Sequence, residues 1–178
     1  MKTKFLILLT TIAVLAFTIY QEHRILPSSN IGFVTNNTST ISSNFKNTVP
    51  NFSYNIFNHK ESDQLYNLKA DKIYVHFWAT WCGVCAKEFK DIITFAKANS
   101  NTKILVISID DDPADLQKFI IKLNKQYNIN KLSNLIFIWD ENRSISLEWS
   151  NTTMVPETYI LDKDYKFLKK IIGRSNWK

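Results

Sequence analysis

Cysteine and histidine are scarce in this chain of 178 residues, which contains two cysteines and three histidines. The histidines, His23, His59 and His76, show no metal-ligand spacing, and the chain has no second cysteine pair. A structural zinc site needs four ligands, commonly supplied by two such pairs, so the sequence argues against one. We therefore expect neither a resident metal nor a cofactor.

The two cysteines form a single pair, Cys82 and Cys85, directly after an apolar run. A purely structural bridge across so short a loop would restrict the unfolded chain little. A strand before the pair and a helix after it favour a redox-active dithiol. At a helix N-terminus the pKa of Cys82 should fall below the ~8.5 of a free thiol, so we assign Cys82 as the nucleophile and Cys85 as the resolving thiol.

Hydrophobic patterns predict alternating strands and helices along the second half of the chain. Asp112 followed by Pro113 is a helix-start signal. Strands are expected over residues 72–78, 103–109, 135–139, 157–161 and 166–172, helices from 85 and from 113, and a short helical segment over 145–149. This order, closed by an antiparallel hairpin, predicts an α/β fold, a mixed sheet flanked by helices. No internal repeat is visible.

The N-terminal residues indicate export. Lys2 and Lys4 precede an apolar stretch over residues 5–20, the layout of a signal sequence, and the positive-inside rule leaves the N-terminus in the cytoplasm. Bulky residues follow the best small-residue site, Ala16 to Thr18, which favours an uncleaved anchor over residues 1–24. The alternative is cleavage and secretion to the periplasm. In either case the domain faces the periplasm, where disulfides persist.

Residues 25–48 are dominated by Ser, Thr and Asn and show no sustained period, so we interpret them as a tether between the anchor and a domain over 49–178. The formal net charge of +6 is spread along helix faces and the terminal hairpin. We interpret it as a solvated surface and, because the domain is exported, expect no nucleic-acid partner.

Two motifs carry a family resemblance: residues 77–85, around the cysteines, and residues 155–162, with Val155, Pro156 and Glu157. Together they resemble the thioredoxin superfamily in its membrane-anchored TlpA, ResA and DsbE (CcmG) branch, over about residues 49–173. The resemblance implies a thioredoxin fold with a helical insertion and thiol-disulfide oxidoreductase activity. It also implies a reductase role in cytochrome c or oxidase maturation, with apocytochrome c or a copper-site protein as client and a membrane thiol reductase as electron donor.

The same resemblance implies the remaining site residues. Pro156 should follow a cis peptide bond and lie beside the dithiol, leaving the Val155 backbone free to pair with an extended client segment. Trp81 is either a border of the site or part of the aromatic core, as Trp78 is expected to be. We interpret Glu157 as part of an acidic docking surface and Glu88 as an ordinary surface residue.

Departures from the family pattern affect the chemistry. Val84 replaces the proline that commonly precedes the second cysteine, Lys90 replaces a helix proline, and the sequence stops soon after Gly173, where relatives continue into a final helix. His76 occupies the strand position of a buried acid. It is either the base for Cys85, with a pKa near working pH, or a neutral core histidine.

Two other functions would also use reactive cysteines. A peroxiredoxin has Pro and Thr at fixed distances before its reactive cysteine, where this chain has Val75 and Ala79. A Sco-like copper carrier for oxidase assembly wants three residues between its cysteines and a later histidine, and no histidine follows His76. Copper binding by the bare dithiol is the alternative that stays open.

Overall fold

The computed structural model describes residues 48–178. The predicted anchor, residues 1–24, and the predicted tether up to residue 47 lie outside the described residues. Thr48, the last tether residue, forms an isolated antiparallel bridge with Lys166. Within the described part of the chain, no helix is both long enough and apolar enough to cross a membrane.

A mixed sheet of five strands forms the centre of the domain, in the order β5-β4-β3-β6-β7. Strands β3, β4 and β5 are parallel, and β6 and β7 are antiparallel to their neighbours. The predicted strands are confirmed to within one residue at each end, and so is the thioredoxin-like fold. Their bounds are β3 (Lys72–Trp78), β4 (Thr102–Ser108), β5 (Leu135–Trp139), β6 (Glu157–Asp162) and β7 (Phe167–Ile172).

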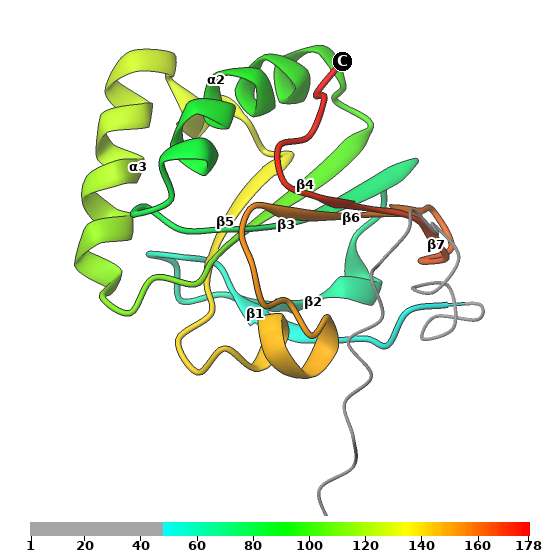
Figure 1. Cartoon of the computed structure of the whole chain (residues 1–178). Helices are drawn as coiled ribbons and strands as arrows, with labels where there is room; N and C mark the ends of the chain where they lie inside the picture. Colours follow the sequence, from blue (N-terminus) through cyan, green and yellow to red (C-terminus); the bar gives the residue numbers. More distant parts are fainter. Residues whose placement is uncertain (1–47) are drawn as a thin grey trace, which may run out of the picture. The chain divides into compact units, whose positions relative to one another are not determined.

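Two helices, α2 (Gly83–Ala98) and α3 (Pro113–Tyr127), cover one face of the sheet (Figure 1). The start of α3 is as predicted, because the Asp112 carboxylate accepts the Ala114 backbone N–H at 2.8 Å and Pro113 needs no partner for its nitrogen. Asn128, in the left-handed conformation, ends α3 and leads into the short helix η2 (Ile129–Lys131).

Smaller elements cover the opposite face (Figure 1). The predicted helical segment is confirmed as one π-helical turn, η3 (Ser144–Trp149). A small antiparallel hairpin, β1 (Ser53–Asn55) with β2 (Ser62–Gln64), and the short helix η1 (Leu65–Asn67) had not been predicted. The two strands are three residues each and largely polar, so they carry no alternating pattern that sequence reasoning can detect.

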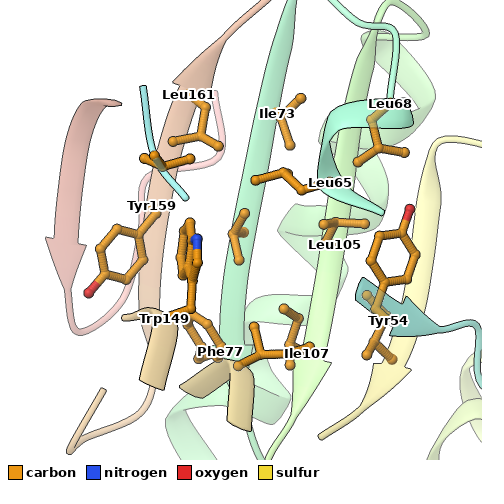
Figure 2. Close-up of a cluster of buried hydrophobic side chains, with 14 of the residues drawn as sticks. Tyr54, Leu65, Leu68, Ile73, Phe77, Leu105, Ile107, Trp149, Tyr159 and Leu161 are labelled. Carbon is orange, nitrogen blue, oxygen red and sulfur yellow. The ribbon is translucent and has the colours of Figure 1, made fainter. Parts of the chain in front are cut away.

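Side chains alternate along the sheet and divide the core into two layers. In β3, Ile73, Val75 and Phe77 face the η3 side (Figure 2). Trp78 faces α2 with no exposed surface, which confirms its prediction as aromatic core. His76, two residues earlier in the same strand, points to the same side as Trp78. The strand period of two therefore places His76 under the helix that begins at the cysteines.

Residues 174–177 follow β7, and we call them the 174–177 strap. They contain no helix. Gly173 has φ of +84°, a conformation that favours glycine, and its N–H donates to the Pro156 carbonyl at 2.8 Å. From this turn the strap leaves the sheet and runs toward α2 (Figure 1). The strap therefore lies over the side of the sheet that carries His76.

Candidate active site

The two cysteines are joined in a disulfide at the start of α2, with an S–S distance of 2.09 Å. Cys82 is the N-cap, and its sulfur accepts the Cys85 backbone N–H at 3.2 Å. Cys82 is partly exposed, whereas Cys85 is fully buried. In the reduced pair, a client disulfide can therefore reach only Cys82, which supports Cys82 as the nucleophile and Cys85 as the resolving thiol.

The start of α2 favours a thiolate on Cys82. Unpaired backbone N–H groups and the positive end of the helix dipole lie at this position, and the first turn contains no acidic side chain to oppose them. The hydrogen bond from the Cys85 backbone N–H to the Cys82 sulfur shows that a donor at the helix N-terminus already contacts the reacting atom.

The loop between β3 and α2 is fixed by Asp110, a buried residue that sequence reasoning missed. Its carboxylate accepts the Thr80 backbone N–H at 3.0 Å, the Thr80 hydroxyl at 2.7 Å and the Ser108 hydroxyl at 2.6 Å. Asp110 follows β4, the parallel neighbour of β3, so both loops leave the sheet at the same edge. That shared edge was the available signal, because the carboxyl ends of parallel strands are where sites form in open α/β sheets.

The Val155–Pro156 peptide bond is cis, as predicted. The Val155 carbonyl oxygen lies 3.7 Å from the Cys82 sulfur, so the structure brings the second motif against the first. Since this backbone lies beside the reacting sulfur, a client segment paired with it would place its own disulfide near Cys82.

The interpretation of Glu157 as part of an acidic docking surface is wrong. Its side chain is 4% exposed and forms an ion pair with Lys170 at 2.8 Å. It also accepts the Thr152 hydroxyl at 2.8 Å. A residue of β6 has β3 on one side and β7 on the other, so Glu157 holds the Thr152–Pro156 loop from within the sheet instead of facing a client.

Exposed apolar side chains adjoin the disulfide. Trp81 is 64% exposed and Val84 51% exposed, on either side of Cys82, which places Trp81 at the border of the site and not in the core. Met154, beside Val155 in the chain, is 62% exposed and had not been predicted. Exposed apolar groups gathered in one place are typical of interaction surfaces, so this rim offers contacts to a client.

His76 is fully buried, and its Nδ1 lies 2.9 Å from the Thr158 hydroxyl. Burial lowers the pKa of His76 to about 3, because the surroundings disfavour the charged ring. The assumption of a pKa near working pH is therefore wrong, and the ring stays neutral during exchange. Its Nε2 has no hydrogen-bond partner among residues 48–178.

Glu88 is buried as well, so its interpretation as a surface residue is wrong. Its Oε1 accepts the Ser175 backbone N–H at 2.6 Å and the Trp177 indole N–H at 2.7 Å. Burial raises the pKa of Glu88, partly offset by these two hydrogen bonds and by Arg174. Helical side chains lean toward the N-terminus of their helix, and Cys85 lies three residues before Glu88 on the same helix face.

No group of three or more potential metal ligands occurs in the part of the chain that the structure describes. The copper-carrier alternative would use Cys82 and Cys85, whose two sulfurs are here bonded to each other.

Residues 45–178 match the protein family described as Redoxin. The thiol-disulfide oxidoreductase ResA of Bacillus cereus is 28% identical over 125 residues, which cover 70% of this chain and 68% of that protein. ResA of Bacillus subtilis is 25% identical over 127 residues, which cover 70% of this chain and 65% of that protein. The thiol:disulfide interchange protein DsbE of Pseudomonas aeruginosa is 29% identical, covering 60% of this chain and 54% of that protein. The chain spans about half to two thirds of these relatives.

Solved structures show the same fold. StoA from Bacillus subtilis superposes with a TM-score of 0.57 at 20% identity, covering 72% of this chain and 91% of that one. The DsbF structure of MTB, in mixed oxidised and reduced forms, gives a TM-score of 0.60 at 19% identity, covering 73% and 92%. At these identities the likeness concerns the fold alone.

Replacing Asp110 by Asn should destabilise the protein by about 2–3 kcal/mol, because an amide presents a donor to hydroxyl and N–H groups that need an acceptor. The loop before Cys82 should loosen and the rate of disulfide exchange should fall. Urea unfolding and the rate of reduction of a model disulfide measure the two effects. The matched control is Asp111→Asn, since the Asp111 side chain is 88% exposed. Equal stability of the two variants would contradict the role given to Asp110.

Replacing His76 by Asn should flatten the pH dependence of stability between pH 6.5 and about 3. In this range the unfolded chain binds a proton on His76 that the folded protein does not, so the wild type loses stability as pH falls. The slope from one such group reaches about 1.4 kcal/mol per pH unit. Urea unfolding at successive pH values measures it, and His59→Asn, at an exposed histidine, should keep the wild-type slope. An unchanged slope in His76→Asn would show that His76 is protonated in the folded protein.

Proposed function

The chain belongs to the Redoxin family and is a thiol-disulfide oxidoreductase, and we propose that it works as a reductase on the disulfides of exported client proteins. The observation that carries the exchange chemistry is the asymmetry of the pair, and the direction, as a reductase, comes from the family resemblance. Cys82 is reachable at a helix N-terminus, and Cys85 is buried behind it.

The reaction consists of two exchange steps. The Cys82 thiolate attacks one sulfur of a client disulfide, a mixed disulfide forms, and the second client sulfur leaves as a thiolate. The Cys85 thiolate then attacks the Cys82 sulfur, the Cys82–Cys85 disulfide forms, and the client leaves with two thiols. Two electrons pass from the pair to the client, so a donor must reduce the pair again, and we propose a membrane thiol reductase for this step.

Client binding uses the surface beside Cys82. The Val155 carbonyl, next to the cis Pro156, accepts a backbone N–H from an extended client segment. The exposed side chains of Trp81, Val84 and Met154 provide apolar contacts on either side of it. Backbone pairing and apolar contact both tolerate different sequences, which suits an enzyme that recognises a disulfide more than its surroundings.

Resolution requires Cys85 to lose its proton inside the protein, because its sulfur has no access to water. His76 is a poor acceptor, with a pKa of about 3. Glu88 is a better one, since burial raises its pKa toward that of a thiol and it lies one helical turn from Cys85. We therefore assign proton acceptance to Glu88.

The cellular setting of the proposal comes from the N-terminal sequence and from the family resemblance. Residues 1–24 would anchor the protein in the inner membrane, and residues 25–48 would hold the domain in the periplasm. The clients would be apocytochrome c or a copper-site protein, during cytochrome c or oxidase maturation. Nothing in the described residues favours the copper-carrier alternative.

A Cys85→Ser variant should accumulate mixed disulfides between Cys82 and its clients, because the second exchange step is lost. Non-reducing electrophoresis followed by mass spectrometry identifies the adducts. The control Cys82→Ser keeps the buried thiol and should accumulate none. Absence of adducts in Cys85→Ser, or equal amounts in both variants, would contradict the assignment of Cys82 as nucleophile.

A reductase should be found mainly as the dithiol in growing cells, whereas an oxidant should be found mainly as the disulfide. Rapid acid quenching followed by alkylation of free thiols measures the two populations by mass. We expect most of the wild-type protein to take two alkyl groups. A predominantly oxidised protein would show that the pair works in the opposite direction.

A further inference from the structure

The 174–177 strap is bonded to the active-site helix through one oxygen of Glu88. Both the Ser175 backbone N–H and the Trp177 indole N–H donate to Oε1. The other oxygen, Oε2, is buried and has no hydrogen-bond partner among residues 48–178. The carboxylate is thus held on one side and left free on the other.

A buried oxygen without a partner is costly, and a functional reason is needed for it. In the disulfide state the Cys85 sulfur carries no proton and cannot donate to Glu88. In the dithiol state the sulfur carries a proton. Glu88 Oε2 therefore has no donor among the described residues in the disulfide state, in which the Cys85 sulfur carries no proton.

Other contacts keep the strap in place. Arg174 forms an ion pair with Asp91 of α2 at 2.8 Å. The Ser175 hydroxyl donates to the Thr158 hydroxyl at 3.1 Å. The Trp177 ring packs between elements, with its centroid 5.5 Å from Tyr74, 5.5 Å from His76 and 5.7 Å from Phe95. These contacts fix the position of the Trp177 indole, whose N–H donates to the Glu88 carboxylate.

The strap is also joined to the loop that carries the cis peptide bond, since the Gly173 N–H donates to the Pro156 carbonyl. The hydroxyl of Thr158, two residues later in β6, bonds both Ser175 and His76. One short segment therefore contacts the active-site helix, the strand beneath it and the end of the client-binding loop.

We propose that Trp177, presented by the 174–177 strap, is a positioning residue for the exchange reaction: its indole N–H holds Glu88 Oε1 so that Oε2 is the atom that takes the proton of Cys85. This proposal rests on the proposed function of Glu88. The proton moves from the Cys85 sulfur to Oε2, and the electron pair left on sulfur forms the bond to Cys82 while the client sulfur leaves.

The charged groups that act on Glu88 are Asp91 of α2 and Arg174 of the strap. The buried titratable groups on the same side of the sheet are His76 of β3 and Cys85 of α2. His76 is neutral at working pH, and the ion pair of Arg174 with Asp91 is exposed. The indole N–H and the Ser175 N–H are therefore the main groups that stabilise the charged form of Glu88 against burial.

The test is a Trp177→Phe variant of the full chain, which keeps an aromatic ring and removes the N–H donor. Losing one hydrogen bond to the carboxylate should raise the pKa of Glu88 further, because the indole N–H stabilises the charged form. Because the charged carboxylate is the active form, the rise of the exchange rate with pH should move to higher pH together with the pKa of Glu88. Stopped-flow reduction of a fluorescent peptide disulfide by the pre-reduced protein gives the rate, and carboxyl carbon NMR gives the pKa.

Trp149→Phe is the matched control. It removes an indole N–H that donates to the Pro50 carbonyl at 2.7 Å on the opposite side of the sheet. It should lower stability without moving the pH profile. A Trp177→Phe variant with an unchanged Glu88 pKa would overturn the proposal, as would an equal pH shift in both variants.

Glu88→Gln separates this proposal from the function on which it rests. If the glutamine variant loses the pH dependence and Trp177→Phe does not shift it, Glu88 is the acceptor and the strap does not position it. If the glutamine variant keeps the pH dependence, Glu88 is not the acceptor and the positioning role falls with it. Client adducts in Cys85→Ser would still report the exchange activity in both cases.

Discussion

The packing of α2 against the end of β3 is the constraint on which the site depends. It places the N-terminus of a helix at the carboxyl edge of the sheet, so that Cys82 lies at the surface and Cys85 lies on the core. A helix start favours a thiolate electrostatically, and a buried resolving thiol cannot be attacked from outside. One packing arrangement therefore supplies both the reactivity of the first cysteine and the protection of the second.

Two loops complete this arrangement, and buried carboxylates hold both of them. Asp110 accepts three hydrogen bonds from Thr80 and Ser108 and fixes the loop that enters α2. Glu157 is paired with Lys170 and Thr152 and fixes the loop that ends at Pro156. Buried acids are costly unless they are fully bonded, and these two have strong donors close by. The 3.7 Å approach of the Val155 carbonyl to the Cys82 sulfur depends on both loops.

Local patterns in the sequence predicted the central sheet and the two helices, because each depends on neighbouring residues, and the family resemblance of the motif around Pro156 implied the cis proline. The residues that were misjudged depend on partners far away in sequence. Glu88 bonds residues 87 and 89 positions later, and no local pattern reports such contacts. Its spacing from Cys85, Phe89 and Ile92 did place it within the buried stripe of α2, but its charge argued for the surface. Glu157 was misjudged for the same reason, since an acidic residue beside a client-binding motif is expected at the surface.

The contrast between His76 and Glu88 supports the proposed assignment of proton acceptance to a buried acid and not to a buried base. Burial disfavours charge on either group, so it lowers the pKa of histidine and raises that of glutamate. For histidine this change moves the pKa away from that of a thiol, and for glutamate it moves the pKa toward it. Proton transfer is most efficient when donor and acceptor are closely matched. In the proposed mechanism, the same apolar surroundings that keep His76 neutral raise the pKa of the acceptor Glu88, and the hydrogen bonds of the 174–177 strap keep part of it charged.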